Sequence, residues 1–218
     1  YEADVLEVFA RMVAAGIVYR QLKPVHWSIE NRTALADAEL EYQDRQDASI
    51  YVLFDVADPA AVRRRLPGLE PQGPLSLMIW TTTPWTLPAN LAVALHPDMT
   101  YAAVDYTDGS GRRRCAVIAE DLVESVFGLG GDVQGSWTVV ATVRGSDLAA
   151  AEVTYVHPIF GKDRLCPVVL ANYVTLEDGT GLVHTAPGHG VEDYGTGLKY
   201  ALDIYCPVQA DGTFDDTV

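Results

Sequence analysis

The stretch L-S-L-M-I-W-T-T-T-P-W, residues 75–85, joins a run of strand-forming residues to a cluster of hydroxyl side chains. Side chains alternate between the two faces of a strand, so Thr81 and Thr83 lie on one face and Thr82 on the other. Pro84 lacks a backbone donor and should end the ladder of hydrogen bonds. The stretch therefore predicts a strand over residues 75–83 that finishes in hydroxyl groups.

Two interpretations of these hydroxyls are open from the pattern alone. Threonine is favoured in strands, so the cluster can reflect strand propensity and the turn that follows. A hydroxyl also donates and accepts hydrogen bonds, so the cluster can form one wall of a site that holds a ribose hydroxyl, a carbonyl or a water molecule.

Working outward, the sequence predicts a mainly β fold with peripheral helices. Short β-branched runs bounded by Gly, Pro or Asp predict strands at 50–56, 101–106, 114–118, 137–143, 166–174 and 181–186. T-D-G-S-G at 107–111 predicts a hairpin turn, and apolar spacing predicts helices at 2–15, 121–127 and 191–202. Many short strands separated by turns indicate a closed or partly open β-barrel.

Composition narrows the classes of function. The formal net charge of −15 over 218 residues argues against broad binding of duplex nucleic acid. Cys115, Cys166 and Cys206 have no C-x-x-C spacing, so neither a disulfide framework nor a thiolate zinc site is expected, and a reducing cytoplasm fits best. No apolar run approaches the about 20 residues of a membrane span, so we expect no membrane association.

The second informative stretch is D-G-T-G-L-V-H-T-A-P-G-H-G-V-E-D-Y, residues 178–194. It predicts a strand that presents His184, a loop, and a helix with Asp193 in its first turn. Free N–H groups at a helix start favour negative charge, so we expect Asp193 to stay ionised, as a ligand for an ammonium group must. Apolar spacing predicts that Val191, Tyr194 and Leu198 face the core, which leaves Asp193 off that face.

Other kinds of chemistry have weaker support. His184, His189 and Asp193 offer ligand types that bind zinc, and a metal-dependent hydrolase is an alternative, although their spacing matches no metal motif. A histidine at a strand end is also commonly structural. The sequence has no G-x-S-x-G elbow and no P-loop.

Together, the stretches W-T-T-T-P-W-T-L-P-A-N (80–90) and G-T-G-L-V-H-T-A-P-G-H-G-V-E-D-Y (179–194) resemble the two signature blocks of the editing domain inserted in isoleucyl-tRNA synthetases. The resemblance extends over about residues 18–214. The related valyl and leucyl enzymes carry T-T-R-P in the first block, where this chain has Thr83. The two signatures of the synthetase activating site are absent, and the chain begins without Met, so we expect an editing insertion from a longer protein.

This resemblance implies a domain organisation and an activity. Residues 1–20 would be a helical entry segment, 21–214 the editing domain and 215–218 an exit linker. The domain would hydrolyse valine misattached to the 3′ end of tRNA(Ile) while excluding isoleucine. One methylene supplies only about 1–3 kcal/mol of discrimination, for which isoleucine against valine is the standard example, so a second selection step is useful.

The resemblance also implies roles for particular residues. Asp193 would bind the α-ammonium group, and His184 would limit the side-chain pocket, with general base as its competing role. Thr81, Thr82 and Thr83 would hold the substrate or the hydrolytic water. Trp85 and Asn90 would contact the terminal adenosine or support the loop.

No nucleophilic side chain is needed for this reaction, because an aminoacyl ester is already activated. No metal or other cofactor is expected. The rest of the synthetase chain would hold the body of the tRNA. A non-catalytic module that binds the tRNA 3′ end is the remaining alternative.

Overall fold

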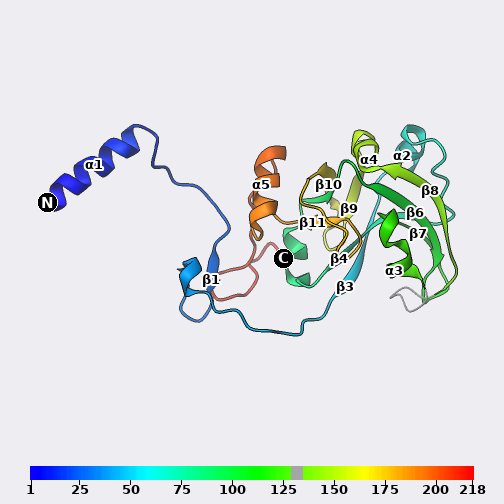
Figure 1. Cartoon of the computed structure of the whole chain (residues 1–218), viewed down its shortest axis with the longest axis horizontal. Helices are drawn as coiled ribbons and strands as arrows, with labels where there is room; N and C mark the ends of the chain where they lie inside the picture. The colour runs from blue at the N-terminus through cyan, green and yellow to red at the C-terminus, as the bar shows by residue number, and fades with distance from the viewer. Residues whose placement is uncertain (129–134) are drawn as a thin grey trace.

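Two β-sheets, one of five strands and one of four, form the body of the molecule (Figure 1). The structure is a computed structural model that describes residues 1–128 and 135–218. A separate hairpin of β1 (His26–Ser28) and β2 (Thr33–Leu35) precedes both sheets. The predominance of strands over helices agrees with the sequence-based expectation.

The five-stranded sheet has the order β3-β4-β7-β6-β8. Its strands are β3 (Ile50–Asp55), β4 (Leu75–Thr81), β7 (Arg113–Ala119), β6 (Thr100–Thr107) and β8 (Trp137–Arg144). β4 runs parallel to β7 and antiparallel to β3, and the other neighbours are antiparallel. All five strands were predicted to within two residues at each end.

The four-stranded sheet has the order β11-β5-β10-β9. Its strands are β11 (Val183–Thr185), β5 (Ala92–Leu95), β10 (Gly161–Leu170) and β9 (Thr154–His157). β5 pairs in parallel with β10 and antiparallel with β11, in a register that places His184 opposite Val93. β5 and β9 were not predicted.

The expected closed or partly open β-barrel is wrong for the residues that the structure describes. Each sheet is open: its two end strands do not pair with one another. In the described ranges, a single bridge, between Val56 and Tyr155, links the sheets. The ladder stops there because Asp58 caps helix α2 (Pro59–Arg65), which turns the chain away from β9. Barrels and separate sheets share the same alternation, so the strand pattern did not distinguish them.

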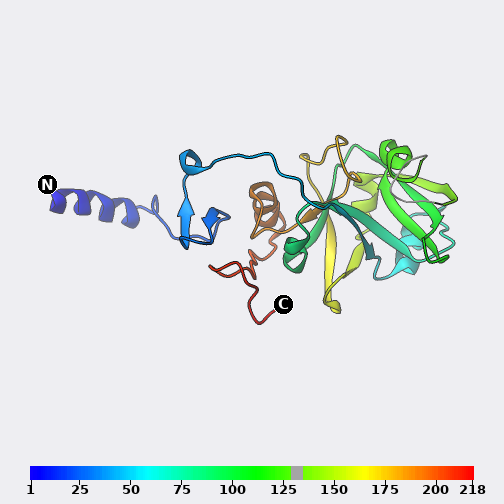
Figure 2. The same cartoon turned by 90° about the horizontal axis from the view of Figure 1, so that it is seen from below.

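Most helices lie at the periphery of the sheets (Figure 1). They are α1 (Glu2–Ala14), α2, α3 (Val123–Phe127), α4 (Gly145–Ala150) and α5 (Val191–Tyr200), with 3-10 turns η1 (Asp37–Glu39), η2 (Pro84–Ala89) and η3 (Glu120–Leu122). The predicted helices at 2–15, 121–127 and 191–202 correspond to α1, to η3 with α3, and to α5. Helix α1 buries no residue and extends away from the sheets in both views (Figures 1 and 2). None of the helices in the described ranges combines the length and apolarity needed to cross a bilayer.

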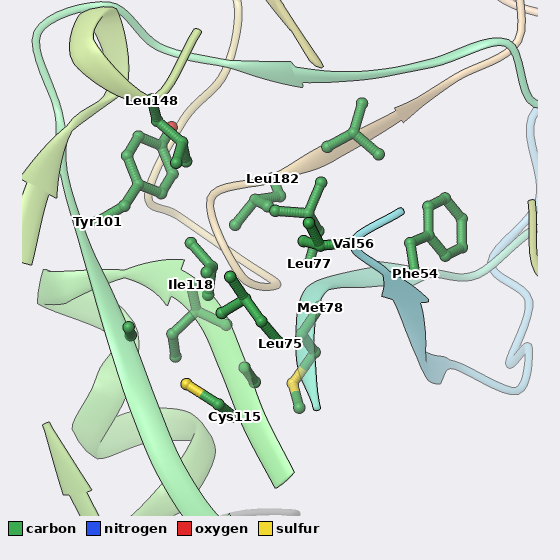
Figure 3. Packing of buried hydrophobic residues seen from close by; sticks show 14 of the residues in the cluster. Phe54, Val56, Leu75, Leu77, Met78, Tyr101, Cys115, Ile118, Leu148 and Leu182 are labelled. Carbon is green, nitrogen blue, oxygen red and sulfur yellow. The ribbon is translucent and has the colours of Figure 1, made fainter. Parts of the chain in front are cut away.

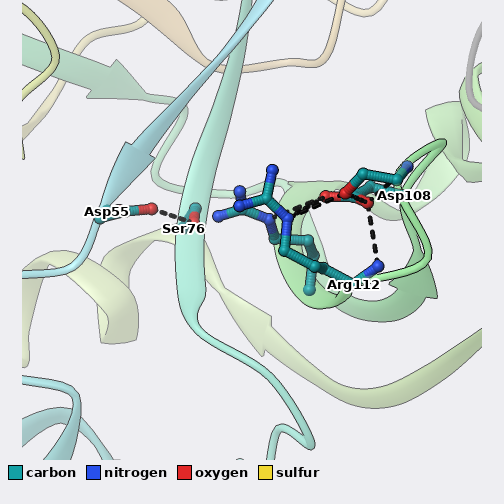
Figure 4. Close-up of polar contacts among 6 residues, drawn as sticks. Asp55, Ser76, Asp108 and Arg112 are labelled. Carbon is teal, nitrogen blue, oxygen red and sulfur yellow. Dashed lines mark hydrogen bonds and ion pairs between the residues drawn. The ribbon is translucent and has the colours of Figure 1, made fainter.

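The main core fills the space around β4, which is buried on both faces. Phe54, Leu77 and Ile118 are fully buried in it together with Tyr101 (Figure 3). Ser76 is also fully buried and donates its hydroxyl to Asp55 at 2.7 Å (Figure 4). Because both faces of β4 are covered, only its carboxyl end is free to meet a ligand.

The predicted hairpin turn at 107–111 joins β6 to β7. The amide of Asp108 donates to the carbonyl of Arg112 at 2.9 Å, which closes the turn. The Asp108 carboxylate accepts hydrogen bonds from Ser110 and from the Arg112 amide (Figure 4), which lower its pKa. The prediction of a turn is confirmed, and the Asp108 carboxylate finds its hydrogen-bond donors within the turn.

Candidate functional site

A cavity of about 420 Å³ opens at the carboxyl end of β4, between β11 and the start of α5. Its lining includes five residues that the sequence singled out: Thr81, Thr82, Thr83, His184 and Asp193. Two segments about a hundred residues apart thus meet at one site because β11 lies against β4.

Strand β4 ends two residues earlier than predicted, and the three threonines then differ in exposure. Thr81 is buried, and its Oγ1 accepts a hydrogen bond from the amide of Thr83 at 3.0 Å. The hydroxyls of Thr81 and Thr83 are 3.3 Å apart, on the same side as the alternation predicts. Thr82 and Thr83 are exposed at the cavity. The arrangement gives a hydroxyl wall in which Thr81 holds the turn.

His184 is 8% exposed, and both of its ring nitrogens contact protein groups. Nε2 lies 2.8 Å from Oγ1 of Thr86, and Nδ1 lies 2.8 Å from Nδ2 of Asn90. Burial lowers the pKa of His184 to about 4, with smaller contributions from His189 and His157. The imidazole is therefore neutral at pH 7, and neither nitrogen is free to take a proton from water.

The structure places Asn90 and Trp85 differently from the residues above. Asn90 is fully buried behind His184 and does not line the cavity. Trp85 is 52% exposed, and its ring meets His189 edge-on with centroids 5.5 Å apart. Asn90 therefore supports the site from behind, whereas Trp85 offers an accessible aromatic ring beside it.

Asp193 is the acidic group of the cavity. Its Oδ2 accepts from the amide of Ala186 at 2.9 Å, and its Oδ1 lies 3.5 Å from the hydroxyl of Tyr173. Burial raises the pKa of Asp193 and so does the charge of Glu192, against the effect of these two hydrogen bonds. The helix start therefore does not lower this pKa, because the loss of water outweighs the local donors. That Asp193 is ionised stays a prediction.

Helix α5 packs through a different face from the one predicted. Val191 and Leu198 are 64% and 56% exposed, whereas Thr196 and Gly197 are buried. A Cβ on Gly197 would lie 2.7 Å from Cβ of Pro187, so only glycine allows this close approach. The helix thus packs through its small residues Thr196 and Gly197. This packing brings the first turn of α5, which contains Asp193, to the cavity.

His189 also lines the cavity, although the sequence pattern indicated only a metal-binding role for it. Its amide donates to the carbonyl of Ala186, and its buried Nε2 has no hydrogen-bond partner among the described residues. Burial lowers the pKa of His189. The only signal in the sequence was its position in the loop P-G-H-G, between the strand and the helix.

The zinc alternative lacks a ligand set. Across residues 1–128 and 135–218, no group of three or more His, Cys, Asp or Glu side chains is arranged to hold a metal ion. His184 directs both nitrogens to protein groups and so does not join His189 and Asp193.

Sequence comparison defines the class of protein. Residues 1–205 match the family described as tRNA synthetases class I (I, L, M and V), and the chain belongs to this family. Isoleucine–tRNA ligase of Thermosynechococcus vestitus is 46% identical over 217 residues, and that of Erwinia tasmaniensis is 43% identical over 213. Each alignment covers 98% of this chain and 22% of the ligase.

Structural comparison shows which part of such enzymes the fold resembles. The editing domain of the Plasmodium knowlesi cytosolic leucyl-tRNA synthetase has a TM-score of 0.55 and 12% identity, over 74% of this chain and 67% of that domain. The structure titled GlLeuRS-CP1 has a TM-score of 0.52 and 17% identity, over 71% and 66%. The chain therefore has the fold of these synthetase editing domains.

Proposed function

We propose that this chain is the editing domain of an isoleucine–tRNA ligase and hydrolyses valine misattached to tRNA(Ile). The observation that supports this most directly is the placement of the Asp193 carboxylate, the hydroxyl wall and His184 around one cavity. These groups can bind an ammonium group, orient an ester and a water, and limit the side chain, respectively.

Asp193 anchors the substrate in this proposal. A ligand ammonium group favours the ionised carboxylate, so binding offsets the effect of burial on its pKa. The amide of Ala186 fixes one carboxylate oxygen and leaves the other, near Tyr173, directed to the ligand. The anchor is thus prepared before the substrate arrives.

The hydroxyls of Thr82 and Thr83 then orient the ester and the attacking water. An aminoacyl ester needs no nucleophilic side chain, and positioning alone accounts for a large part of such a rate increase. Thr81 contributes by holding the backbone of Thr83. The reaction proceeds by attack of water on the ester carbonyl and release of valine from the ribose.

His184 acts by its shape in this proposal. Its neutral ring has no free nitrogen for general base catalysis. A rigid ring at the end of the pocket admits valine and excludes the longer side chain of isoleucine. Discrimination against one extra methylene is expected at about 1–3 kcal/mol.

The macromolecular partner is the single-stranded 3′ end of tRNA(Ile). The exposed ring of Trp85 can stack on the terminal base, a contact worth about 1–3 kcal/mol. A net charge of −15 leaves the tRNA body to the rest of the ligase, from which residues 1–20 lead into the domain and 215–218 lead out. Three free cysteines agree with an activity in the cytoplasm.

The test measures deacylation of valyl-tRNA(Ile) and isoleucyl-tRNA(Ile) by the full-length ligase that carries this domain, beside its His184→Ala variant. The wild-type protein should release valine selectively, and the variant should release isoleucine at least about tenfold faster than the wild type. Equal hydrolysis of both esters by the wild type would contradict the assignment of His184. No hydrolysis of either ester would contradict the proposed function itself.

A further inference from the structure

Behind His184, a chain of buried hydrogen bonds runs from β9 to the hydroxyl wall. The hydroxyl of Tyr155 donates to Oδ1 of Asn90, whose Nδ2 contacts Nδ1 of His184. On the other side of the ring, Nε2 contacts Oγ1 of Thr86, and that hydroxyl donates to the carbonyl of Thr83 at 2.9 Å. Five residues from three segments are therefore linked in one series.

The chemistry of the partners fixes the direction of every bond in this series. Nδ2 of Asn90 also lies 2.9 Å from the carbonyl of Ala92, which can only accept, so the amide NH₂ must face it. The same NH₂ faces Nδ1 of His184, which is therefore an acceptor. The ring proton then sits on Nε2 and is donated to Thr86.

Tyr155 is built into the fold as the first donor of the series. It is fully buried, its ring packs on Phe54 with centroids 5.0 Å apart, and its backbone pairs with Val56 at the single bridge between the sheets. Burial raises the pKa of Tyr155 well above its usual value, so its hydroxyl keeps the proton that it donates. Its position is fixed by packing that does not involve the cavity.

We propose that Tyr155 is a positioning residue for substrate selection, which acts through Asn90 to fix the ring orientation and the Nε2–H tautomer of His184. This inference rests on the proposed function, because it names the residue that fixes His184, the group proposed to exclude isoleucine from the same site. Tyr155 touches no substrate. Together with the carbonyl of Ala92, it holds Asn90 in the orientation that makes Nδ1 of His184 an acceptor. Thr86 accepts from Nε2–H of His184 and donates to the carbonyl of Thr83.

The substitution Tyr155→Phe follows directly from this geometry. It keeps the ring that packs on Phe54 and removes only the hydroxyl. Oδ1 of Asn90, which is fully buried, then lacks a donor, a state that proteins avoid. Only the carbonyl of Ala92 then orients the amide, and the contact that fixes the tautomer of His184 is weakened.

The first measurement uses ring-¹⁵N NMR of His184 in this chain. Wild type should show the Nε2–H tautomer alone, and Tyr155→Phe should show a mixture of tautomers. Tyr106→Phe is the matched control: Tyr106 is a buried tyrosine in the other sheet, in contact with Phe127. It should leave the His184 signals unchanged. An unchanged Nε2–H signal in Tyr155→Phe would overturn the proposal.

The second measurement uses the full-length ligase and the ratio of valyl to isoleucyl ester hydrolysis. Tyr155→Phe should lower this ratio by about five- to tenfold, and Tyr106→Phe should not. In a His184→Ala background, Tyr155→Phe should leave the ratio unchanged within about twofold, because the group it positions is gone. The same loss in both backgrounds would overturn the proposal, since Tyr155 would then act through general stability.

The two measurements separate this inference from the proposed function. If the ligase does not hydrolyse the valyl ester, the proposed function is wrong, and so is the proposed role of Tyr155 in substrate selection. The NMR result then still decides whether Tyr155 fixes His184. If the ligase is selective and Tyr155→Phe does not change the ratio of valyl to isoleucyl ester hydrolysis, only the proposed role of Tyr155 is wrong.

Discussion

The two sides of the cavity treat their polar atoms differently. At the rear wall, formed by Thr86 and His184 with Asn90 behind them, both nitrogens of the imidazole are bonded to protein. At the front wall, formed by Asp193 and His189, Nε2 of the histidine has no partner in the described part of the chain, and one carboxylate oxygen has only a 3.5 Å contact.

This difference indicates that the two walls have different roles. Satisfied polar atoms give a ligand nothing to bind, but they fix the shape of the wall that they form. Buried atoms without partners are costly, and a ligand that supplies the missing partner regains that cost. The rear wall is therefore suited to excluding a side chain, and the front wall to binding polar groups of the substrate.

The largest effect should follow from removing the charge of the front wall. Asp193→Asn keeps the size of the side chain but loses the proposed ionic bond to the ammonium group of the substrate. We expect valyl ester hydrolysis to fall by about two orders of magnitude, because breaking one side of a buried charge pair costs about 2–5 kcal/mol.

The control for that experiment is Glu192→Gln, which removes a neighbouring charge at an exposed position. It should change the rate by less than about twofold, since exposed charges contribute little. If both variants lost the same activity, general electrostatics rather than a specific anchor would explain the loss.

A smaller effect should follow from moving the front wall as a unit. Gly197→Ala forces α5 away from Pro187, which shifts Asp193 relative to the fixed rear wall. We expect hydrolysis to fall about tenfold, because a displacement near 1 Å is costly in a positioned reaction. The ratio of valyl to isoleucyl hydrolysis should persist, because the rear wall has not moved.

Gly195→Ala is the matched control on the same helix. A Cβ there meets no atom within 4 Å, and alanine favours helix by about 1 kcal/mol over glycine. The variant should be active and slightly more stable in thermal unfolding. An equal loss of activity in both variants would show that α5 tolerates no alanine, independent of Pro187.

The contrast between the two walls also shows how far the sequence alone leads. Alternation in residues 75–83 correctly placed the hydroxyls of Thr81 and Thr83 on one side. Residues 178–194 correctly predicted a strand with His184, a loop, and a helix with Asp193 in its first turn. These are local features, set by strand geometry and turn chemistry, so they can be derived from one stretch at a time.

The remaining features depend on packing between distant segments. Tyr155 gave no signal, because its role requires Asn90, which lies 65 positions earlier and meets it only in the fold. The buried face of α5 was predicted from apolar spacing, yet Gly197 and Pro187 decide it by close approach. The pKa of Asp193 was likewise set by burial rather than by its place in the helix. The open sheets, too, follow from pairing that alternation does not specify.

His189 gives a test of the front wall with a smaller effect. His189→Phe keeps an aromatic ring against Trp85 and removes the unpartnered Nε2. We expect KM for the valyl ester to rise about three- to tenfold with kcat nearly unchanged, as for the loss of one hydrogen bond to the bound substrate. His26→Gln, on the exposed strand β1, is the control. An unchanged KM would show that the substrate does not reach Nε2.

Lowering the pH should give the smallest effect that distinguishes the two walls. The rear wall has no acceptor for a second proton on the ring of His184. The pKa of His184 is lowered from 6.5 to about 4, and so is that of His157, which contacts the carbonyl of Leu87 behind the same loop. The unfolded chain binds these protons first as the pH falls below 6.5. Their stabilising contribution is therefore complete above pH 6.5 and is lost between pH 6.5 and 4.

We expect Tm to fall by roughly 5 to 10 °C between pH 7 and pH 5 through these two histidines, in thermal unfolding followed by circular dichroism. The raised pKa of Asp193 acts in the opposite sense, because the folded state then binds a proton more readily than the unfolded chain. The comparison of wild type with His157→Gln isolates one histidine, since all carboxylates remain. The variant should be less stable at pH 7 but lose less Tm on acidification. Equal losses would mean that buried neutral histidines do not hold the loop behind the rear wall, and acid would then act elsewhere in the fold.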